Sequence, residues 1–458
     1  MARRLWSVAG GVCAAVAAHA DPCAARWAEG FDTYGMDGGV LTLSVADVGE
    51  GPRLFAAGTF STAGSEFVNR IAMWDGRGWH AMNDGVDSSV FALSGGPSGG
   101  IGPDSLYAGG NFLTAGGESI PHLARWDGAS WHAVGGGVGG VTSPFITALL
   151  RSDVSGADAL YVGGSFLDAG GAPASYVARW DGSAWSALGA GLSDRAQAFT
   201  VYDDGRGPAL YAGGRFLMAG GIEAARVARW DGASWEALGA GVGGLVNTMA
   251  VYDDGRGRAL YVGGSFSSAG GAPAQNLARW DGAAWEDVAG GTLGLVYSLA
   301  VFDDRAGEGP ALYVGGRFDV AGGVIASRIA RWNGASWSML ASGLTPSTPG
   351  KGAPSGSARA IIAHDDGSGP GLFAGGEFIL AGGEVAQNIA RWYVPRGCCP
   401  GDANVDLRVD MLDLNIVLGE FGMAGPGLHG DVTRDGRVDF RDLVGVLGLF
   451  GSSCLPND

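Results

Sequence analysis

The stretch RWDGASWEALGAGV, Arg229–Val242, recurs with small changes along the chain. Closely similar stretches begin at Arg125, Arg179, Arg279 and Arg331. Each contains two tryptophans five residues apart, with Asp-Gly or Asn-Gly directly after the first. Such dipeptides between apolar segments are typical of tight hairpin turns. We therefore expect the two tryptophans to face each other across a turn between adjacent strands.

The tryptophan pair marks a repeat. Its first member recurs at intervals of 50 to 60 residues, at Trp74, Trp126, Trp180, Trp230, Trp280, Trp332 and Trp392. All but the last have the second member, at Trp79, Trp131, Trp185, Trp235, Trp285 and Trp337. A large aromatic ring can bury ~150–250 Å². The recurring pairs are therefore expected to fill the space between neighbouring units.

One unit divides into four short segments separated by turn signals. In residues 248–291 these segments read TMAVYDDG, RALYVGG, NLARWDG and AWEDVAGG. Glycine, at 86 of 458 residues, lacks the collagen period, and 10% aromatic residues argue against a disordered chain. Four antiparallel strands in roughly fifty residues describe one blade of a β-propeller. The sequence predicts an all-β fold.

The seventh unit is divided between the two ends of the chain. Trp392 lacks a downstream partner, and Trp27 lacks an upstream one. The sequence of residues 35–58 matches the second half of a repeat, as in residues 189–214. We therefore predict a seven-bladed β-propeller over residues 21–395, closed by an N-terminal strand that places Trp27 beside Trp392.

These repeats resemble those of Kelch-type propellers, with Gly-Gly after the second strand and a tryptophan opening the fourth. The sequence pattern LYVGGxFxxAGG…ARWDGxxW is more similar still to repeats of fungal cortical cell-polarity marker proteins. In Kelch-like rings the loop between the second and third strands reaches the ligand face. The resemblance implies that this face, for a carbohydrate or a protein, would be lined by Asp168, Arg215, Glu223, Arg317, Asp319, Glu377 and Glu384.

The N-terminal residues are typical of a secretory signal peptide. Two arginines precede an apolar run that ends in Ala18-His19-Ala20, so cleavage is expected after Ala20, which assigns residues 1–20 to the signal. No later stretch is apolar enough to span a membrane, so no membrane insertion is expected after cleavage. The formal net charge of −17 argues against nucleic-acid binding. We expect a protein that is secreted, extracellular or at the cell surface.

Four cysteines follow the signal peptide: Cys23, Cys398, Cys399 and Cys454. An even number in an exported protein suggests two disulfides. A bond from Cys23 to Cys398 or to Cys399 would join the two parts of the divided blade. A Cys399–Cys454 bond would close the ends of the C-terminal module.

Residues 396–458 differ in composition and contain a duplicated loop. DANVDLRVDMLD (Asp402–Asp413) and DVTRDGRVDFRD (Asp431–Asp442) both place oxygen-bearing side chains at positions 1, 3, 5, 9 and 12. Calcium requires six to eight oxygen ligands, which a short loop can supply by wrapping the ion. We expect one or two calcium ions, held by Asp402, Asn404, Asp406, the Arg408 carbonyl, Asp410 and Asp413, and by Asp431, Thr433, Asp435, the Arg437 carbonyl, Asp439 and Asp442.

Each loop is followed by an apolar helical pattern. The expected buried faces are Met411, Leu414, Leu418 and Phe421, and Phe440, Leu443, Leu447 and Phe450. Paired EF-hand-like loop–helix units of this kind resemble a type I dockerin, which implies a cohesin-like partner. The chain departs from that pattern at Leu407, where the turn favours glycine, and at Thr433. The pairs Met411-Leu412 and Phe440-Arg441 differ from the small hydroxyl residues common at these positions in the family.

No G-x-S-x-G elbow, Walker loop or HExxH motif is present, and the histidines have no metal-ligand spacing. The paired acids Asp203-Asp204, Asp253-Asp254, Asp303-Asp304 and Asp365-Asp366 suggest solvated hairpin turns rather than a ring of metal ligands. The arginine before each first tryptophan is expected at the surface or in a hydrogen bond between blades.

The predicted function is therefore that of a secreted, calcium-binding docking or scaffold protein. Its propeller would be a rigid binding module attached to a polysaccharide-degrading or cell-surface assembly. The alternative is a carbohydrate-active enzyme, a glycoside hydrolase or lyase, that uses carboxylates of the ligand face.

Overall fold

A computed structural model describes residues 25–28, 35–95, 105–154, 156–304, 309–346, 356–393, 409, 411–424, 428, 430, 432 and 437–448. These residues belong to two compact units, which divide near residues 24 and 397. The predicted boundaries after residues 20 and 395 lie outside the described residues, as do Cys23, Cys398, Cys399 and Cys454. No helix of the described part is long and apolar enough to cross a membrane.

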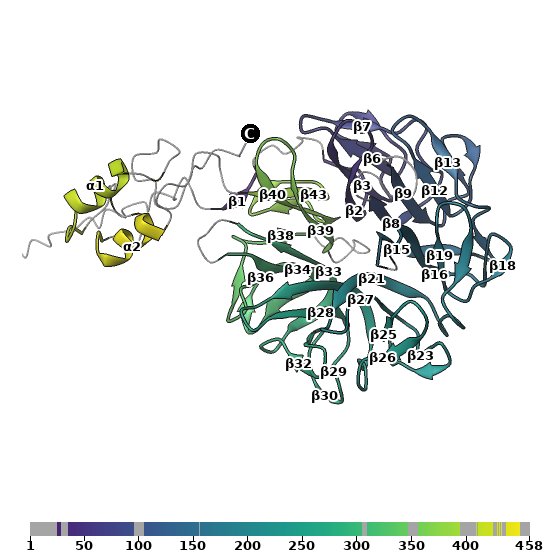
Figure 1. The fold of residues 1–458 in the computed structure, drawn as a ribbon. Helices are drawn as coiled ribbons and strands as arrows, with labels where there is room; N and C mark the ends of the chain where they lie inside the picture. The colour runs from purple at the N-terminus through teal and green to yellow at the C-terminus, as the bar shows by residue number, and fades with distance from the viewer. Residues whose placement is uncertain are drawn as a thin grey trace, which may run out of the picture. The chain divides into compact units, whose positions relative to one another are not determined.

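The larger unit has a β-propeller-like all-β fold made of successive antiparallel sheets (Figure 1). In each sheet the strands pair in chain order, except that β1 joins the last sheet. The sheets are β2 (Val40–Asp47), β3 (Pro52–Gly58), β6 (Ile71–Trp74) and β7 (Trp79–Ala81); β8 (Val90–Gly95), β9 (Leu106–Gly110), β12 (Leu123–Trp126) and β13 (Trp131–Ala133); β15 (Phe145–Ser152), β16 (Ala159–Ser165), β19 (Val177–Trp180) and β20 (Trp185–Ala187); β21 (Ala196–Asp203), β22 (Pro208–Gly214), β25 (Val227–Trp230) and β26 (Trp235–Ala237); β27 (Leu245–Asp253), β28 (Arg258–Ser265), β31 (Leu277–Trp280) and β32 (Trp285–Asp287); β33 (Thr292–Phe302), β34 (Ala311–Ala321), β36 (Ile329–Trp332) and β37 (Trp337–Met339), with β35 (Val324–Ile325) on β34; and β39 (Ser357–Asp365), β40 (Pro370–Glu377), β43 (Ile389–Tyr393) and β1 (Arg26–Trp27).

Further short strands lie outside these sheets. They are β4 (Thr62–Ala63), β5 (Glu66–Phe67), β10 (Thr114–Ala115), β11 (Glu118–Ser119), β14 (Val138–Gly139), β17 (Asp168–Ala169), β18 (Ala172–Pro173), β23 (Met218–Ala219), β24 (Ile222–Glu223), β29 (Ser268–Ala269), β30 (Ala272–Pro273), β38 (Leu344–Thr345), β41 (Leu380–Ala381) and β42 (Glu384–Val385). Most form two-residue hairpins between the second and third strands of a sheet.

The first strands of the sheets contact one another in series. β2 contacts β8, and the series continues through β15, β21, β27, β33 and β39, which contacts β2 again. These strands lie in the middle of the unit and the fourth strands lie at its periphery (Figure 1). The first strand of each sheet has a one-residue register shift against the second strand. One residue of the first strand therefore has no opposite partner there.

The tryptophans face each other as the sequence predicts. Trp230 pairs with Trp235 across the turn between β25 and β26, with ring centroids 5.3 Å apart. The indole N–H of Trp235 donates to the carbonyl oxygen of Leu188, in the preceding sheet's last turn, at 2.9 Å. Gly270 (φ +60°) permits the same packing in the next sheet, since a Cβ there would lie 3.0 Å from the Cβ of Trp285. Trp131, Trp185, Trp285 and Trp337 donate in the same way, so these pairs also link two sheets.

The N-terminal strand completes the last sheet. Trp27 pairs with Trp392 in antiparallel register, and their rings lie 5.4 Å apart. The indole N–H of Trp27 donates to Leu340, as the tryptophans of intact hairpins donate to a preceding sheet. The predicted pairing of the two ends of the repeat is confirmed.

The smaller unit contains helices α1 (Met411–Gly419) and α2 (Phe440–Gly448). Its fully buried apolar residues are Val409, Val417, Val438 and Val446, with Leu414, Leu428, Val432 and Leu443 packed against them. The predicted buried faces are wrong at Met411, Leu418, Phe421, Phe440 and Leu447, which are about half exposed or more. Phe450 lies outside the described residues.

The prediction is wrong because the side chains of two aspartates point into the core of the unit. Asp413 and Asp442 have no exposed surface, and each lies in the first turn of its helix. Turning these carboxylates inward rotates both helices, so that Val417 and Val446 face the core. Because α1 is apolar around most of its circumference and the polar Asp442 of α2 turns inward, the apolar spacing alone does not define the buried face.

Replacing Trp235 tests the link between sheets. W235A should lower the free energy of unfolding by about 3–5 kcal/mol, because it removes a buried aromatic ring. W235F, which keeps a ring but loses the indole N–H, should cost about 1 kcal/mol through the bond to Leu188. Denaturant unfolding checks this, with F67A at the exposed Phe67 as the control. Equal midpoints for W235A and F67A would contradict the role assigned to Trp235.

Candidate functional site

At one end of the sheets, positions with the same residue in every sheet lie next to positions whose residue differs from sheet to sheet. In each sheet a variable residue directly follows the last glycine of the second strand, and a buried phenylalanine such as Phe216 or Phe318 comes next. The phenylalanine packs in the core, whereas the variable residue can change without disturbing the packing. The seven variable residues are Thr59, Asn111, Ser165, Arg215, Ser265, Arg317 and Glu377.

A second set of variable residues lies at the register shifts of the first strands. Its members are Leu41, Phe91, Thr147, Gln197, Asn247, Tyr297 and Arg359. Two of them bond to the adjacent first strand: the Thr147 hydroxyl donates to Ala196 at 2.6 Å and the Asn247 amide donates to Val296 at 2.8 Å. The other residues carry aliphatic, aromatic, amide or cationic groups at equivalent places.

An arginine–aromatic cluster forms around β15, β21 and β22. The guanidinium of Arg195 lies over the ring of Phe145, 5.4 Å from its centroid, and Phe145 makes an edge contact with Phe91 at 6.2 Å. The backbone N–H of Arg215 donates to the carbonyl of Arg195 at 3.1 Å. Asp194 lies 3.6 Å from the Nε of Arg215. Arg215 is the one member of this cluster that the sequence singled out.

A second cluster lies on β33, β39 and β40. Arg359 lies 4.2 Å from the centroid of the Tyr297 ring, and one of its terminal nitrogens is 3.9 Å from Glu377. Cation–π stacking and the weak ion pair together orient this guanidinium. Glu377, which was predicted on the ligand face, therefore faces a cation.

The other predicted ligand-face residues are distributed over different sheets. Asp168 is half-buried on β17 and pairs with Gly139, whereas Glu223 on β24 and Glu384 on β42 are exposed. Asp319 forms an ion pair with Arg328, and Arg317 is exposed at the end of its sheet. The structure thus brings Arg215 and Glu377 into clusters and leaves Asp168, Glu223, Arg317, Asp319 and Glu384 apart from them.

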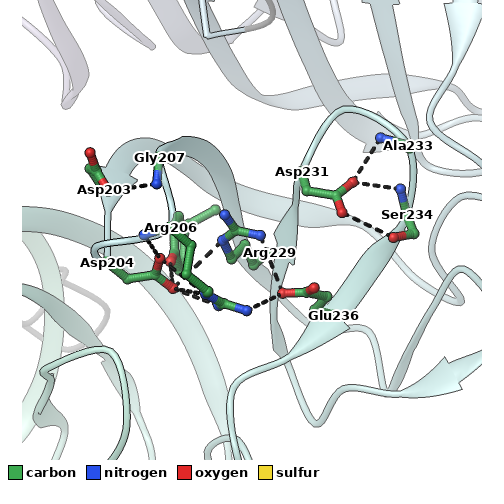
Figure 2. A network of polar contacts seen from close by, with 10 residues as sticks. Asp203, Asp204, Arg206, Gly207, Arg229, Asp231, Ala233, Ser234 and Glu236 are labelled. Carbon is green, nitrogen blue, oxygen red and sulfur yellow. Dashed lines mark hydrogen bonds and ion pairs between the residues drawn. The ribbon is translucent and has the colours of Figure 1, made fainter.

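Polar networks occupy the opposite ends of the strands, at the paired acids. Figure 2 shows the network around β21 and β22, in which the first acid, Asp203, accepts the backbone N–H groups of Gly205 and Gly207. The second acid, Asp204, contacts Arg206 at 2.6 Å and Arg229 at 3.6 Å. Its side chain is only 1% exposed.

The second acids are therefore buried members of an ion-pair network, and the prediction of a solvated turn is correct only for the first ones. Tyr211 donates to Asp204 at 2.9 Å, and Glu236 extends the network by pairing with both arginines. The same contacts recur around Asp254, with Arg256, Arg279, Tyr261 and Glu286.

The sequence predicts that the arginine before each first tryptophan lies at the surface or bonds between blades. For Arg229 this prediction is wrong. Arg229 is buried and binds acids of its own sheet, and Arg279, Arg331 and Arg391 are also buried. A local sequence reading missed this because the acid and the arginine lie on different hairpins.

These contacts determine the charge state of the buried acid. Burial alone would raise the pKa of Asp204, but hydrogen bonds from Arg206 and Tyr211 and the nearby guanidinium groups hold it below its usual value. Burial, together with the bond to Asp204, raises the pKa of Tyr211. The network is thus ionic at neutral pH, and its acid oxygens are engaged by arginine and tyrosine.

Replacing Asp204 tests this network. D204N should destabilise the protein by about 3 kcal/mol near neutral pH, because it leaves buried arginines without their carboxylate. The lowered pKa means that the contribution of Asp204 is present above its ordinary value of 3.8 and is lost as pH falls through the folded-state pKa. Unfolding of D204N and wild type should therefore converge in acid. D203N, at the exposed turn, is the control; a gap independent of pH would refute the assignment.

The predicted calcium ligands lie only partly in the described residues. Asp413, Arg437, Asp439 and Asp442 are described; Asp402, Asn404, Asp406, Arg408, Asp410, Asp431, Thr433 and Asp435 lie outside. The backbone N–H of Asp439 donates to the Asp442 carboxylate at 2.8 Å, so the structure brings two predicted ligands of the second loop together. Among the described side chains, no group of three or more His, Cys, Asp or Glu converges.

The donor chemistry fits calcium. All side-chain ligands proposed for the two loops are carboxylate, amide or hydroxyl oxygens, the hard ligands that calcium prefers. Asp413 and Asp442 occupy equivalent places in the two halves and are both fully buried. Buried carboxylates are generally paired or bound to a metal.

Comparisons with known proteins assign the chain to no family. No family model matches the chain, and no curated protein matches it. It is similar to the solved extracellular domain of a one-component system from B. thetaiotaomicron, with 9% identity and a TM-score of 0.45, over 80% of this chain and 39% of that one. It is also similar to BBS1N in complex with ARL6DN, with 11% identity and a TM-score of 0.43, over 81% and 98% of the two chains. The chain thus spans about two fifths of the length of the bacterial domain.

Proposed function

We propose that this protein is an extracellular docking protein. Its larger unit would be a closed, seven-bladed, Kelch-like propeller that binds a carbohydrate or protein ligand. Its C-terminal module would be a dockerin-like, calcium-binding domain that attaches the propeller to a cohesin-like partner in a polysaccharide-degrading or cell-surface assembly. The serial contacts among the first strands, which return from β39 to β2, support the closed ring.

The symmetry of the C-terminal module carries this proposal. Buried Asp413 and Asp442 are offset by 29 residues, and the core pairs Val409/Val438 and Val417/Val446 have the same offset. Two equivalent halves, each with an inward carboxylate in the first helical turn, are what a duplicated calcium loop requires. Bound calcium would tie the oxygen atoms of each loop to the helix that follows it.

The outer surfaces of the two helices provide a docking surface, which we define as Met411, Leu412, Leu418, Phe440, Val444 and Leu447. All six side chains are more than half exposed. Exposed apolar side chains gathered in this way are typical of protein-binding sites. This docking surface results from the rotation of the two helices. A helix that turns Asp413 or Asp442 inward leaves its large apolar side chains on the outside.

Secretion and the disulfides remain part of the proposal. The signal-like residues 1–20, the acidic composition and the four cysteines support an extracellular location. The alternative of a glycoside hydrolase or lyase receives less support, because Asp319 and Glu377 each face an arginine and the other ligand-face acids lie on separate sheets.

Calcium titration of the full chain tests the metal site. Wild type should bind calcium in a calorimetric titration, and calcium should raise the unfolding temperature of the helical module. D413N and D442N should each weaken binding at their own loop by about tenfold or more, because each loses a charged ligand. D84N, at an exposed acid of the propeller, should bind as wild type does. An absence of calcium binding by wild type would refute the metal site.

Charge introduced on the docking surface tests the partner. The full chain, immobilised with calcium, should retain a cohesin-like exported protein of the source organism, and a chelator should release it. L418K and L447K should abolish retention while leaving calcium binding intact, because they place a charge in an apolar contact. I325K, at another exposed apolar residue of the larger unit, is the control. Retention by L418K and L447K would exclude this surface.

A further inference from the structure

We propose that Phe145, Arg195, Arg215 and Gln197 form a binding site for a sugar acid at the inner ends of β15, β21 and β22. The two arginines would pair with the carboxylate, and the phenyl ring would pack against the sugar ring. This inference rests on the proposed role of the propeller as a binding module and names the chemistry of its ligand.

The fold does not require arginine at either position. In two other sheets the same backbone hydrogen bond joins Thr59 to Gly39 at 3.0 Å and Asn111 to Ser89 at 3.1 Å, where Arg215 bonds to Arg195 at 3.1 Å. Equivalent backbone geometry is therefore reached with small or neutral residues. The backbone geometry therefore does not need the two guanidinium groups, which can serve a ligand instead.

The cluster contains two arginines, Arg195 and Arg215, and one acid, Asp194. Buried Arg229 engages both Asp204 and Glu236, whereas Arg215 pairs with Asp194 across 3.6 Å, with both side chains about half exposed. Burial and the positive charge of Arg215 both lower the pKa of Arg195. The two cations thus repel each other, and a carboxylate placed between them would relieve that repulsion.

Two further polar atoms are available to a ligand. The Nε of Arg195 and the Oε1 of Gln197 are buried and have no hydrogen-bond partner among the described residues. Buried polar atoms of this kind usually bind water or a ligand. Gln197 lies at the register shift of β21, two residues beyond Arg195, and so belongs to the same end of the sheet.

A sugar acid matches all the groups of the cluster. Its carboxylate suits the planar guanidinium donors, the C–H face of its ring suits Phe145, and its hydroxyl groups can donate to Gln197. An acidic peptide supplies the carboxylate but neither the ring nor the hydroxyl array. Because the chain carries a net charge of −17, long polyanions would be repelled beyond the cluster, which favours a short oligosaccharide.

Calorimetry on the full chain tests the site, with trigalacturonate as the probe. Binding should be detected and should weaken with added salt, whereas the methyl-esterified trisaccharide should bind at least about tenfold more weakly. R195Q and R215Q should each reduce affinity by about tenfold or more, and F145A should weaken both sugars. R258Q, at an exposed arginine of another hairpin, should leave binding unchanged.

The unfolding temperature of every variant shows whether it has folded, and R195K gives a second, milder change that keeps the charge. Equal binding of the neutral sugar, unchanged affinity in both R195Q and R215Q, or preferential binding of triaspartate would overturn the proposal. An absence of binding by wild type would also overturn it. Calcium-dependent capture through the docking surface would be unaffected by any of these results, so the two proposals fail separately.

Discussion

The hydrogen bond from a tryptophan indole to the last turn of the preceding sheet is the contact on which the larger unit depends. Trp235 makes it to Leu188 and Trp285 makes it to Leu238, each from the outermost strand of a sheet. Among the described residues, the main strands of adjacent sheets do not pair with one another, so side chains hold the sheets together with the help of short backbone bridges such as that between Leu192 and Ala219. The paired ring across the turn orients the donor, and Trp27 extends the same contact to the sheet that joins the chain ends.

Arginine has two different roles in this architecture. At the hairpins of the outer turns, Arg229 is buried against Asp204 and Glu236, and the whole network is neutralised within one sheet. At the other end, Arg195 and Arg215 lie together with Asp194 beside an aromatic ring. The first arrangement stabilises the sheet, because its charges are matched and hydrogen-bonded. The second leaves cationic surface accessible, and an acidic protein that places its cations this way is suited to a small anionic ligand.

The C-terminal module reverses the usual distribution of polar and apolar groups on a helix. Asp413 and Asp442 are buried, while Met411 and Phe440, two residues earlier, are exposed. A buried carboxylate is costly unless it is compensated. Asp442 already accepts a hydrogen bond from the backbone N–H of Asp439, and the proposed metal would add to such contacts at both carboxylates, with the displaced apolar side chains available to a partner. In the proposed function, metal binding and docking would be coupled through the rotation of two short helices.

The sequence by itself determined the all-β class, the hairpin that carries each tryptophan pair and the pairing of Trp27 with Trp392. The hairpins follow from local turn chemistry, and the pairing of Trp27 with Trp392 follows from the spacing of the repeat. It also singled out Arg215 and Glu377 as candidate site residues. Tertiary structure alone decided that Asp204 is buried, that Arg195 joins Arg215, and which faces of α1 and α2 are inside. The physical reason is that these properties depend on contacts between separate hairpins or helices, and the spacing of residues within one segment carries no information about them.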